Sequence, residues 1–328
     1  IYRAGLDVGS TTAKITVLDD SGRLLFSRYE RHNAKVNELV GRYLDEIEQQ
    51  LGPIQLRLCV TGSVGMSAAE QMKAEFVQEV VAATVFARHR YPQAKALIDI
   101  GGEDAKVVFF NGQSMELRMN GNCAGGTGAF IDQMSVLMGC TNSEMNDKAM
   151  TSTRLYPMAA RCGVFAKTDI QALMNDGAAK ADIALSVFQA VVNQTIGNLA
   201  QGRPIGGNVA FLGGPLHFLP ELKKRFIETL KLDDEHVVDV DYGNYFVAVG
   251  AALSDDAGVT DMREMEACIA RAEAAAAAET RTADFVLFKD AADYAAFKER
   301  HDRDRVRRGD FSSYRGPVWI GIDAGSTT

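Results

Sequence analysis

Two short segments of the chain place a carboxylate at the end of an apolar run and follow it with a turn of small residues. In the first, Asp7 precedes Gly9, Ser10, Thr11 and Thr12. A glycine allows the backbone to approach a phosphate without a Cβ atom in the way, and turn N–H groups and hydroxyls donate hydrogen bonds to phosphate oxygens. We therefore expect this turn to bind phosphate. Asp7 would hold Mg²⁺ through water, since Mg²⁺ keeps much of its hydration.

The same arrangement returns later in the chain, where Asp99 precedes Gly101, Gly102 and Glu103. A single strand followed by a glycine turn is common in α/β proteins, but two carboxylate–glycine hairpins in one chain are a more specific signal. They indicate two turns that hold the phosphates of one nucleotide between two halves of the protein. The sequence has no lysine-containing Walker loop, so a P-loop site is a poor alternative.

Two further features belong to the candidate site. Gly213 and Gly214 follow the apolar run 209–212, and adenine or ribose can lie against backbone that carries no side chains. Lys14 either adds positive charge beside the phosphates or is an ordinary lysine on a strand surface. The predicted catalytic residues are Asp7, Asp99 and Glu103, and the predicted nucleotide-binding residues are Gly9, Ser10, Thr11, Thr12, Lys14, Gly101, Gly102, Gly213 and Gly214.

Two of the five cysteines, Cys123 and Cys162, lie beside glycines at the start of predicted helices. The helix dipole and the unpaired N–H groups there favour a thiolate and a bound anion, such as a thiolate-ligated iron–sulfur cluster. A cubane cluster usually takes four thiolates, so a second copy of the chain or a second internal repeat would supply the other two. The alternative is a buried structural cysteine, which we expect for Cys59, Cys140 and Cys268.

Strands alternate with helices along most of the chain, which predicts a mixed sheet flanked by helices. Apolar and β-branched runs predict strands over residues 4–8, 14–18, 24–29, 56–61, 96–100, 209–212 and 237–240. Helical spacing of apolar residues predicts helices over 37–51, 76–91, 162–176, 178–200, 219–230 and 245–254, a glycine-rich start and then a helix over 121–139, and an alanine-rich helix over 262–280.

An internal repeat links the two ends of the sequence. Residues 5–12 and 321–328 differ at only two of eight positions, and a repeat at this distance indicates a duplicated domain. We therefore expect four parts, which are one α/β subdomain with the phosphate turns (1–120), a second with the cysteine motifs and the adenosine turn (121–256), a helical connector (257–316) and the start of a second, truncated repeat (317–328).

Composition limits the classes of protein to consider. The chain has 328 residues and a net charge of −8, which argues against a nucleic-acid-binding surface. No apolar run approaches the ~20 residues that span a bilayer, and five cysteines in a chain of this length do not form a disulfide scaffold. We expect a cytoplasmic protein that binds neither membrane nor nucleic acid.

Four segments together resemble the ATPase activators of 2-hydroxyacyl-CoA dehydratases and the related ATPase subunits of benzoyl-CoA reductases. They are residues 7–12, 99–106, 122–130 and 161–169. The resemblance implies an actin/sugar-kinase-like (ribonuclease H-like) duplicated α/β fold with an interdomain nucleotide cleft. It also implies ATP or ADP with Mg²⁺ in the cleft, and a [4Fe-4S] cluster held by Cys123 and Cys162 and shared across a homodimer or an intrachain pseudo-dimer. ATP hydrolysis would then drive one low-potential electron to a partner dehydratase or reductase.

The sequence departs from this family at Glu103, where the family usually has a glutamine that helps to position the attacking water. A glutamate there can act as a base or repel the γ-phosphate. The tandem architecture resembles large multidomain relatives rather than the short activators. Two alternatives use the same fold. One is a small-molecule kinase, with Glu103 or Asp104 as base, and the other is a non-catalytic ATP-binding scaffold.

Overall fold

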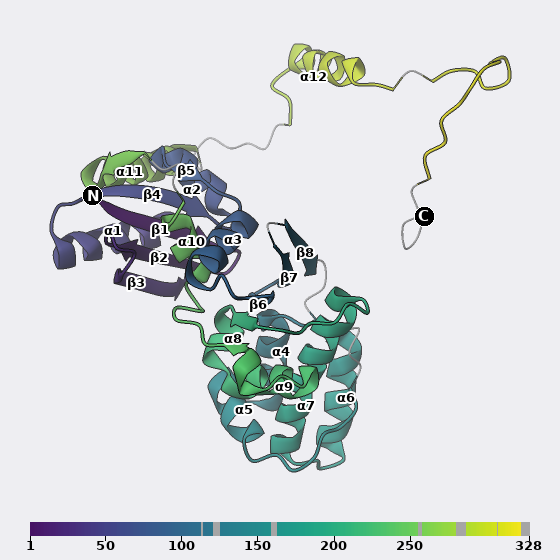
Figure 1. The fold of residues 1–328 in the computed structure, drawn as a ribbon. Helices are drawn as coiled ribbons and strands as arrows, with labels where there is room; N and C mark the ends of the chain where they lie inside the picture. Colours follow the sequence, from purple (N-terminus) through teal and green to yellow (C-terminus); the bar gives the residue numbers. More distant parts are fainter. Residues whose placement is uncertain are drawn as a thin grey trace. The chain divides into compact units, whose positions relative to one another are not determined.

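The computed structural model describes residues 1–112, 114–120, 125–158, 163–254, 258–279, 287–306 and 308–322 (Figure 1). The chain divides into two units, residues 1–274 and residues 275–328. The first unit contains two sheets. Each sheet, together with the helices that pack on it, is called a lobe, and the lobes are numbered in chain order.

The first lobe is built on a sheet in the order β11-β4-β1-β2-β3, with β5 paired to β4. Strands β1 and β2 pair antiparallel, as do β2 and β3, whereas β1 and β4 run parallel. Apolar side chains from these strands alternate into a buried core, as expected for a sheet covered by helices. The strands are β1 (Tyr2–Val8), β2 (Thr12–Leu18), β3 (Leu24–Arg31), β4 (Gln55–Thr61), β5 (Glu75–Phe76) and β11 (Val259–Asp261).

The second lobe repeats this connectivity. Its sheet has the order β10-β9-β6-β7-β8, with two antiparallel pairings followed by a parallel strand, β9 beside β6. The duplicated α/β fold that the sequence predicts is therefore confirmed. The strands are β6 (Ala96–Ile100), β7 (Ala105–Asn111), β8 (Ser114–Asn120), β9 (Val209–Leu212) and β10 (Val237–Val238).

Helices cover the first sheet with one apolar stripe each. In α1 (Val36–Leu51) the buried residues recur at helical spacing, and Tyr43 donates from its hydroxyl to the carbonyl oxygen of Ala13 at 3.1 Å. Helix α2 (Gly65–Met72) packs on the same core. So does α11 (Met262–Glu279), through Met262, Met265 and Ile269. Part of the predicted connector thus belongs to the first lobe.

The helices of the second lobe surround a separate apolar core that includes Phe130, Phe188 and Phe226. Helix α5 begins with a capping box, in which Thr141 and Glu144 satisfy each other's backbone N–H groups. These helices are α4 (Gly128–Met138), α5 (Asn142–Ala149), α6 (Gly163–Asn175), α7 (Lys180–Thr195) with a π-helical end (Ile196–Ala200), α8 (Gly214–Phe218) and α9 (Pro220–Leu230).

Two helices connect the lobes and pack closely against each other. Helix α3 (Glu79–Arg90) leads from the first sheet to the second, and α10 (Phe246–Ala252) leads back. A Cβ atom on Gly250 would lie 1.9 Å from the carbonyl oxygen of Ala82. The small residues of α10 are therefore required by the close approach of the two helices.

Several boundaries differ from the sequence prediction. Strands β6, β7 and β8 fall within residues 1–120 but form the second sheet, so the sheets divide the chain between β5 and β6. The prediction also missed several short elements, whose apolar residues are few or lie close to turn residues. They are β5, β7, β8, β11, α2, α5 and α8.

The described residues of the second unit include helix α12 (Ala291–Arg303), capped by Asp290, which accepts a hydrogen bond from the N–H of Asp293 at 2.8 Å. Every residue of this helix is exposed. The predicted repeat from residue 317 stays a prediction, because residues 323–328 lie outside the described residues. Across the described part of the chain, no helix is long and apolar enough to span a membrane.

Candidate nucleotide site

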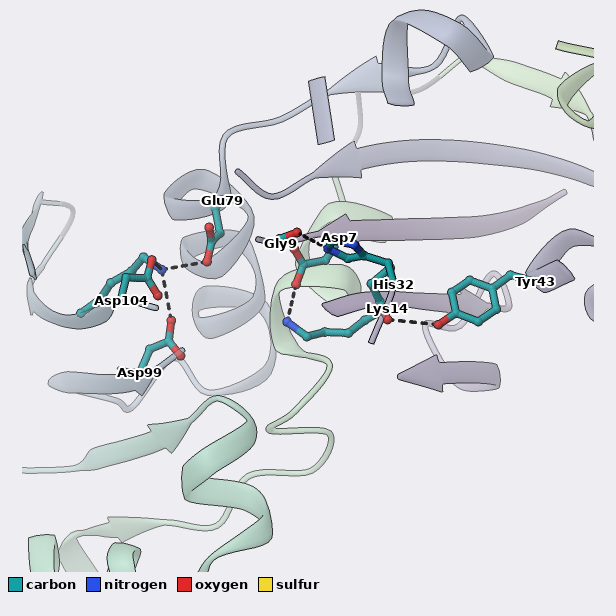
Figure 2. Close-up of polar contacts among 10 residues, drawn as sticks. Asp7, Gly9, Lys14, His32, Tyr43, Glu79, Asp99 and Asp104 are labelled. Atoms are coloured by element: carbon teal, nitrogen blue, oxygen red, sulfur yellow. Dashed lines mark hydrogen bonds and ion pairs between the residues drawn. The ribbon is translucent and has the colours of Figure 1, made fainter. Parts of the chain in front are cut away.

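The first phosphate turn is held by the β1–β2 hairpin. Asp7 is the next-to-last residue of β1 and lies opposite Lys14 on β2, with Oδ2 and Nζ 2.7 Å apart (Figure 2). The N–H of Gly9 donates to the carbonyl oxygen of Thr12 at 2.9 Å and closes the turn. The imidazole Nε2 of buried His32 lies 3.0 Å from the carbonyl oxygen of Gly9 and supports the turn from behind. Lys14 thus faces the site rather than an open strand surface.

The second phosphate turn is held in the same way by the β6–β7 hairpin. Asp99 lies opposite Lys106 in the strand register, as Asp7 lies opposite Lys14. The N–H of Gly101 donates to the carbonyl oxygen of Asp104 at 2.9 Å. The Lys106 ammonium lies 2.6 Å from Asp104 and 3.6 Å from Asp99. The duplication therefore extends from the strands to their charged residues.

A glycine stands beside each aspartate at the end of the neighbouring parallel strand. Gly62 follows β4 with φ of +96°, and Gly213 follows β9 with φ of +92°. A Cβ atom would lie 2.3 Å from the carbonyl oxygen of Val8 at Gly62, and 2.2 Å from that of Ile100 at Gly213. Both positions therefore require glycine for conformation as well as for space. Gly213 was among the site residues predicted from the sequence, whereas its counterpart Gly62 was not.

Sequence reasoning also missed Glu79, the first residue of α3. Its carboxylate lies 2.8 Å from the Lys106 ammonium (Figure 2). Burial raises the pKa of Glu79, and the charges of Asp7 and Asp104 raise it further, against the opposing effect of Lys106. The available signal was an acidic residue in the first turn of a predicted helix.

Burial and neighbouring charges shift the pKa values of Asp99 and Lys14. It raises the pKa of Asp99 to about 7, and Asp104 and Glu79 add to the effect while Lys106 opposes it. Burial alone would lower the pKa of Lys14, but the charge of Asp7, with smaller effects from Tyr29 and Asp99, raises it overall. Lys14 therefore stays positively charged at neutral pH.

These turns meet at a cleft made of two adjoining cavities. One, of about 220 Å³, is lined by both phosphate turns and is called the phosphate half. The other, of about 250 Å³, includes apolar residues and is called the nucleoside half. The predicted residues that line the phosphate half are Asp7, Gly9, Ser10, Thr11, Thr12, Lys14, Gly101, Gly102 and Glu103, and those that line the nucleoside half include Asp99, Gly213 and Gly214.

The nucleoside half has aromatic walls and an ion pair that joins the two lobes. The rings of Tyr29 and Phe218 lie edge to face with centroids 5.7 Å apart, and a Cβ atom on Gly214 would lie 2.6 Å from the Tyr29 hydroxyl. Arg31, at the end of β3, donates to Asp132 of α4 at 3.0 Å. The cavity thus combines apolar surface with a few polar groups, as ligand pockets usually do.

The sequence profile of the BadF/BadG/BcrA/BcrD ATPase family matches residues 4–254. The chain belongs to this ATPase family. The resemblance to activators of 2-hydroxyacyl-CoA dehydratases is thereby confirmed, and the protein is an ATPase. It is 28% identical to the (R)-2-hydroxyglutaryl-CoA dehydratase activating ATPase of Acidaminococcus fermentans over 224 residues, which is 65% of this chain and 83% of that one.

Two solved structures of dehydratase activators share the fold of this BadF/BadG/BcrA/BcrD ATPase. Component A of the Acidaminococcus fermentans (R)-2-hydroxyglutaryl-CoA dehydratase superposes with a TM-score of 0.69 at 24% identity, covering 81% of this chain and 99% of that one. The activator of the 2-hydroxyisocaproyl-CoA dehydratase from Clostridium difficile, with bound ADPNP, superposes with a TM-score of 0.65 at 21% identity, covering 84% and 98%. At these identities the likeness concerns the fold.

The charges in the cleft of this ATPase fit a divalent cation. Among the described residues of the site, the carboxylates of Asp7, Glu79, Asp99 and Asp104 pair with the two ammonium groups of Lys14 and Lys106, and Glu103 adds a further negative charge. This excess of negative charge lies where the turns offer N–H groups to phosphate, which is itself an anion. Mg²⁺ binds hard oxygen ligands, commonly one or two carboxylates together with phosphates and water. Within the described ranges, no three His, Cys, Asp or Glu side chains are grouped closely enough to hold a metal by themselves.

The two predicted cluster ligands, Cys123 and Cys162, lie outside the described residues. Helix α6 begins at Gly163, the residue after Cys162 in the sequence, and α4 begins at Gly128. Of the other cysteines, Cys59 and Cys268 are buried and Cys140 is partly buried. The cluster ligands therefore stay a prediction of the sequence.

Proposed function

We propose that this ATPase couples ATP hydrolysis to the transfer of one low-potential electron, from a [4Fe-4S] cluster to a partner CoA-thioester dehydratase or reductase. The family assignment and the relatives named as dehydratase activators support an activator role. The observation that carries the proposal is the cleft itself, in which two equivalent Asp–Lys hairpins, one from each lobe, present glycine turns to the same space.

In this proposal the phosphates of ATP lie between the two turns, and Mg²⁺ is held by the phosphates and Asp7. Glu79 takes the proton from the water that attacks the γ-phosphorus, as the bond between that phosphorus and the bridging oxygen of ADP breaks. A general base works best with a pKa near the operating pH. The raised pKa of Glu79 and its place in both cavities support this role.

The second phosphate turn is hydrogen-bonded to the start of α4, the helix that follows Cys123 in the sequence. The carbonyl oxygens of Gly101 and Gly102 accept hydrogen bonds from the N–H groups of Gly128 and Ala129, at 2.9 Å and 2.7 Å. These two residues form the first turn of α4, which follows Cys123 in the sequence. We propose that loss of the γ-phosphate releases contacts that hold the lobes together, and that α4 transmits this movement to the cluster.

A [4Fe-4S] cluster would supply a one-electron couple whose potential responds to hydrogen bonding and solvent exposure. Cys123 and Cys162 would hold it together with two thiolates from a second copy or a second repeat. Whichever source applies, the cluster needs both cysteines of this chain.

The test is iron and acid-labile sulfide on protein purified without oxygen, with Cys123→Ala and Cys162→Ala beside the control Cys140→Ala. We expect about four irons per pair of sites, lost in either of the first two variants and kept in the control. Protein that holds no iron after reconstitution, yet hydrolyses ATP, would contradict the electron-transfer role and leave an ATPase of another kind.

A further inference from the structure

Lys106 joins three separate elements of the site through one ammonium group. It extends from β7 and contacts Asp99 at the end of β6, Asp104 in the second phosphate turn and Glu79 at the start of α3, at 3.6, 2.6 and 2.8 Å. Its side chain is only 7% exposed. Burying an ammonium group is costly unless it is paired, so these contacts fix its position.

The duplication shows which of these contacts is additional. In the first lobe, Lys14 forms its ion pair with Asp7 across the hairpin. The equivalent partner of Lys106 is Asp99, and Asp104 belongs to the same hairpin. Glu79 belongs to neither hairpin, because it begins the helix that connects the lobes. The repeated hairpin therefore accounts for the pairing of Lys106 with Asp99, but not for its contact with Glu79.

Lys106 also lies behind the wall of the cleft rather than on it. Glu79 and Asp104 line the phosphate half, and Glu79 and Asp99 line the nucleoside half, whereas Lys106 lines neither. A nucleotide in the cleft would meet the carboxylates through water and Mg²⁺, and would not contact the ammonium group. Any effect of Lys106 on hydrolysis must then pass through the carboxylates that it holds.

We infer that Lys106 is a positioning residue for ATP hydrolysis, which holds the Glu79 carboxylate against the second phosphate turn at the point where water attacks. The inference rests on the proposed role of Glu79 as the base. Without the ammonium group, Glu79, Asp99 and Asp104 would repel one another across a buried space. Glu79 would turn away from its partners, and the water would lose its base while the nucleotide kept its binding contacts.

The test is a double-mutant cycle on Mg²⁺-dependent ATP hydrolysis, with Lys106→Met, Glu79→Gln and the double variant. We expect each single variant to lower kcat by about 10²-fold, the lower range for a general base, with a KM for ATP within about threefold of the parent. The double variant should be no slower than Glu79→Gln. Losses that multiply in the double variant would overturn the inference.

Two outcomes separate this inference from the proposal beneath it. Glu79→Gln with the parent kcat would remove Glu79 as the base, and Lys106 as its positioning residue with it. If Glu79→Gln is slow and the losses of the two single variants multiply in the double variant, only the role of Lys106 is removed.

Because Lys106→Met leaves three carboxylates without their cation and can fail to fold, Glu79→Asp provides a second test. It keeps the charge but shortens the reach to Lys106, so kcat should fall while the midpoint of thermal unfolding and the KM stay near the parent values. A parent-like kcat in Glu79→Asp would count against the inference.

Discussion

Lys14 and Lys106 occupy equivalent positions in the two lobes. Each lies on the second strand of its β-hairpin, directly opposite the aspartate that is the next-to-last residue of the first strand. Lys14 lines both halves of the cleft, whereas Lys106 lies behind the wall, in contact with Asp99, Asp104 and Glu79. The equivalence means that one hairpin design, repeated, supplies a carboxylate, an ammonium group and a glycine turn in each lobe. The two hairpins differ in their surroundings, because Lys106 also pairs with Glu79 of the connecting helix α3.

The glycines beside the aspartates should not tolerate a side chain. In Gly62→Ala the new Cβ atom would lie 2.3 Å from the carbonyl oxygen of Val8 and 2.6 Å from Oδ1 of Asp7. Gly52→Ala is the matched control, because Gly52 also has a positive φ, +77°, but nothing lies within 4 Å of its Cβ position. We expect Gly52→Ala to cost about 1–3 kcal/mol from backbone strain, because φ of 77° with ψ of −178° is a conformation that essentially only glycine adopts.

Gly62→Ala should cost clearly more than this control and abolish ATP hydrolysis, because Asp7 or the end of β1 must move. Chemical denaturation and a hydrolysis assay measure the two effects. Equal unfolding free energies in the two alanine variants would show that the close contact with Val8 relaxes without consequence.

The sequence was sufficient for the parts of the site that depend on local patterns. Strands over 96–100 and 209–212 were predicted at their observed bounds, because each is an apolar run that ends in glycine. Asp7, Asp99 and the two phosphate turns follow from the same pattern, and the structure brings them into one cleft.

Relationships between distant segments could not be read from the sequence. Glu79 and Lys106 become part of the site only because α3 begins beside the β6–β7 hairpin. The division between the lobes was misplaced because β6 follows the first-lobe elements without a linker, and only its hydrogen bonds to β7 and β9 assign it to the second sheet. The return of α11 to the first lobe likewise depends on pairing of β11 with β4.

The buried Asp99 should make the stability of the nucleotide-free protein depend on pH. Burial raises the pKa of Asp99 to about 7 in the folded chain, against about 3.9 in an unfolded one. Between these values the folded state binds more protons than the unfolded state, so the free energy of unfolding should fall as the pH rises from about 4 to about 7, and level off above that.

Asp99→Asn removes this contribution, while Lys106 keeps Glu79 and Asp104 as partners. The difference in unfolding free energy between the variant and the parent, measured by denaturant titration at several pH values, should therefore shift in favour of the variant up to about pH 7. A difference that is constant with pH would contradict the assigned ionisation of Asp99.

Glu103 should weaken nucleotide binding by its charge. It is exposed and lines the phosphate half of a cleft that already carries excess negative charge. Glu103→Gln removes one of these charges and should tighten ATP binding about two- to fivefold, with a smaller gain at high ionic strength because salt screens exposed charges. Titration calorimetry at two salt concentrations measures this. The control is Glu75→Gln, because Glu75 is exposed and lines neither cavity. This variant should leave the ATP affinity unchanged at both salt concentrations.

The ion pair between Arg31 and Asp132 should stabilise the closed cleft by a small amount. It connects β3 of the first lobe to α4 of the second, at the wall of the nucleoside half. The two side chains are 61% and 39% exposed, and exposed pairs contribute about 0–1 kcal/mol. Arg31→Ala or Asp132→Ala should therefore weaken ATP binding by no more than about fivefold. The double variant should bind ATP at least as tightly as the single variant with the lower affinity.

The control is Arg42→Ala, whose pair with Glu30 has similar exposure but lies within the first lobe, so it should leave ATP affinity unchanged. A loss as large as a hundredfold in Arg31→Ala alone would instead indicate that the guanidinium contacts the nucleotide directly.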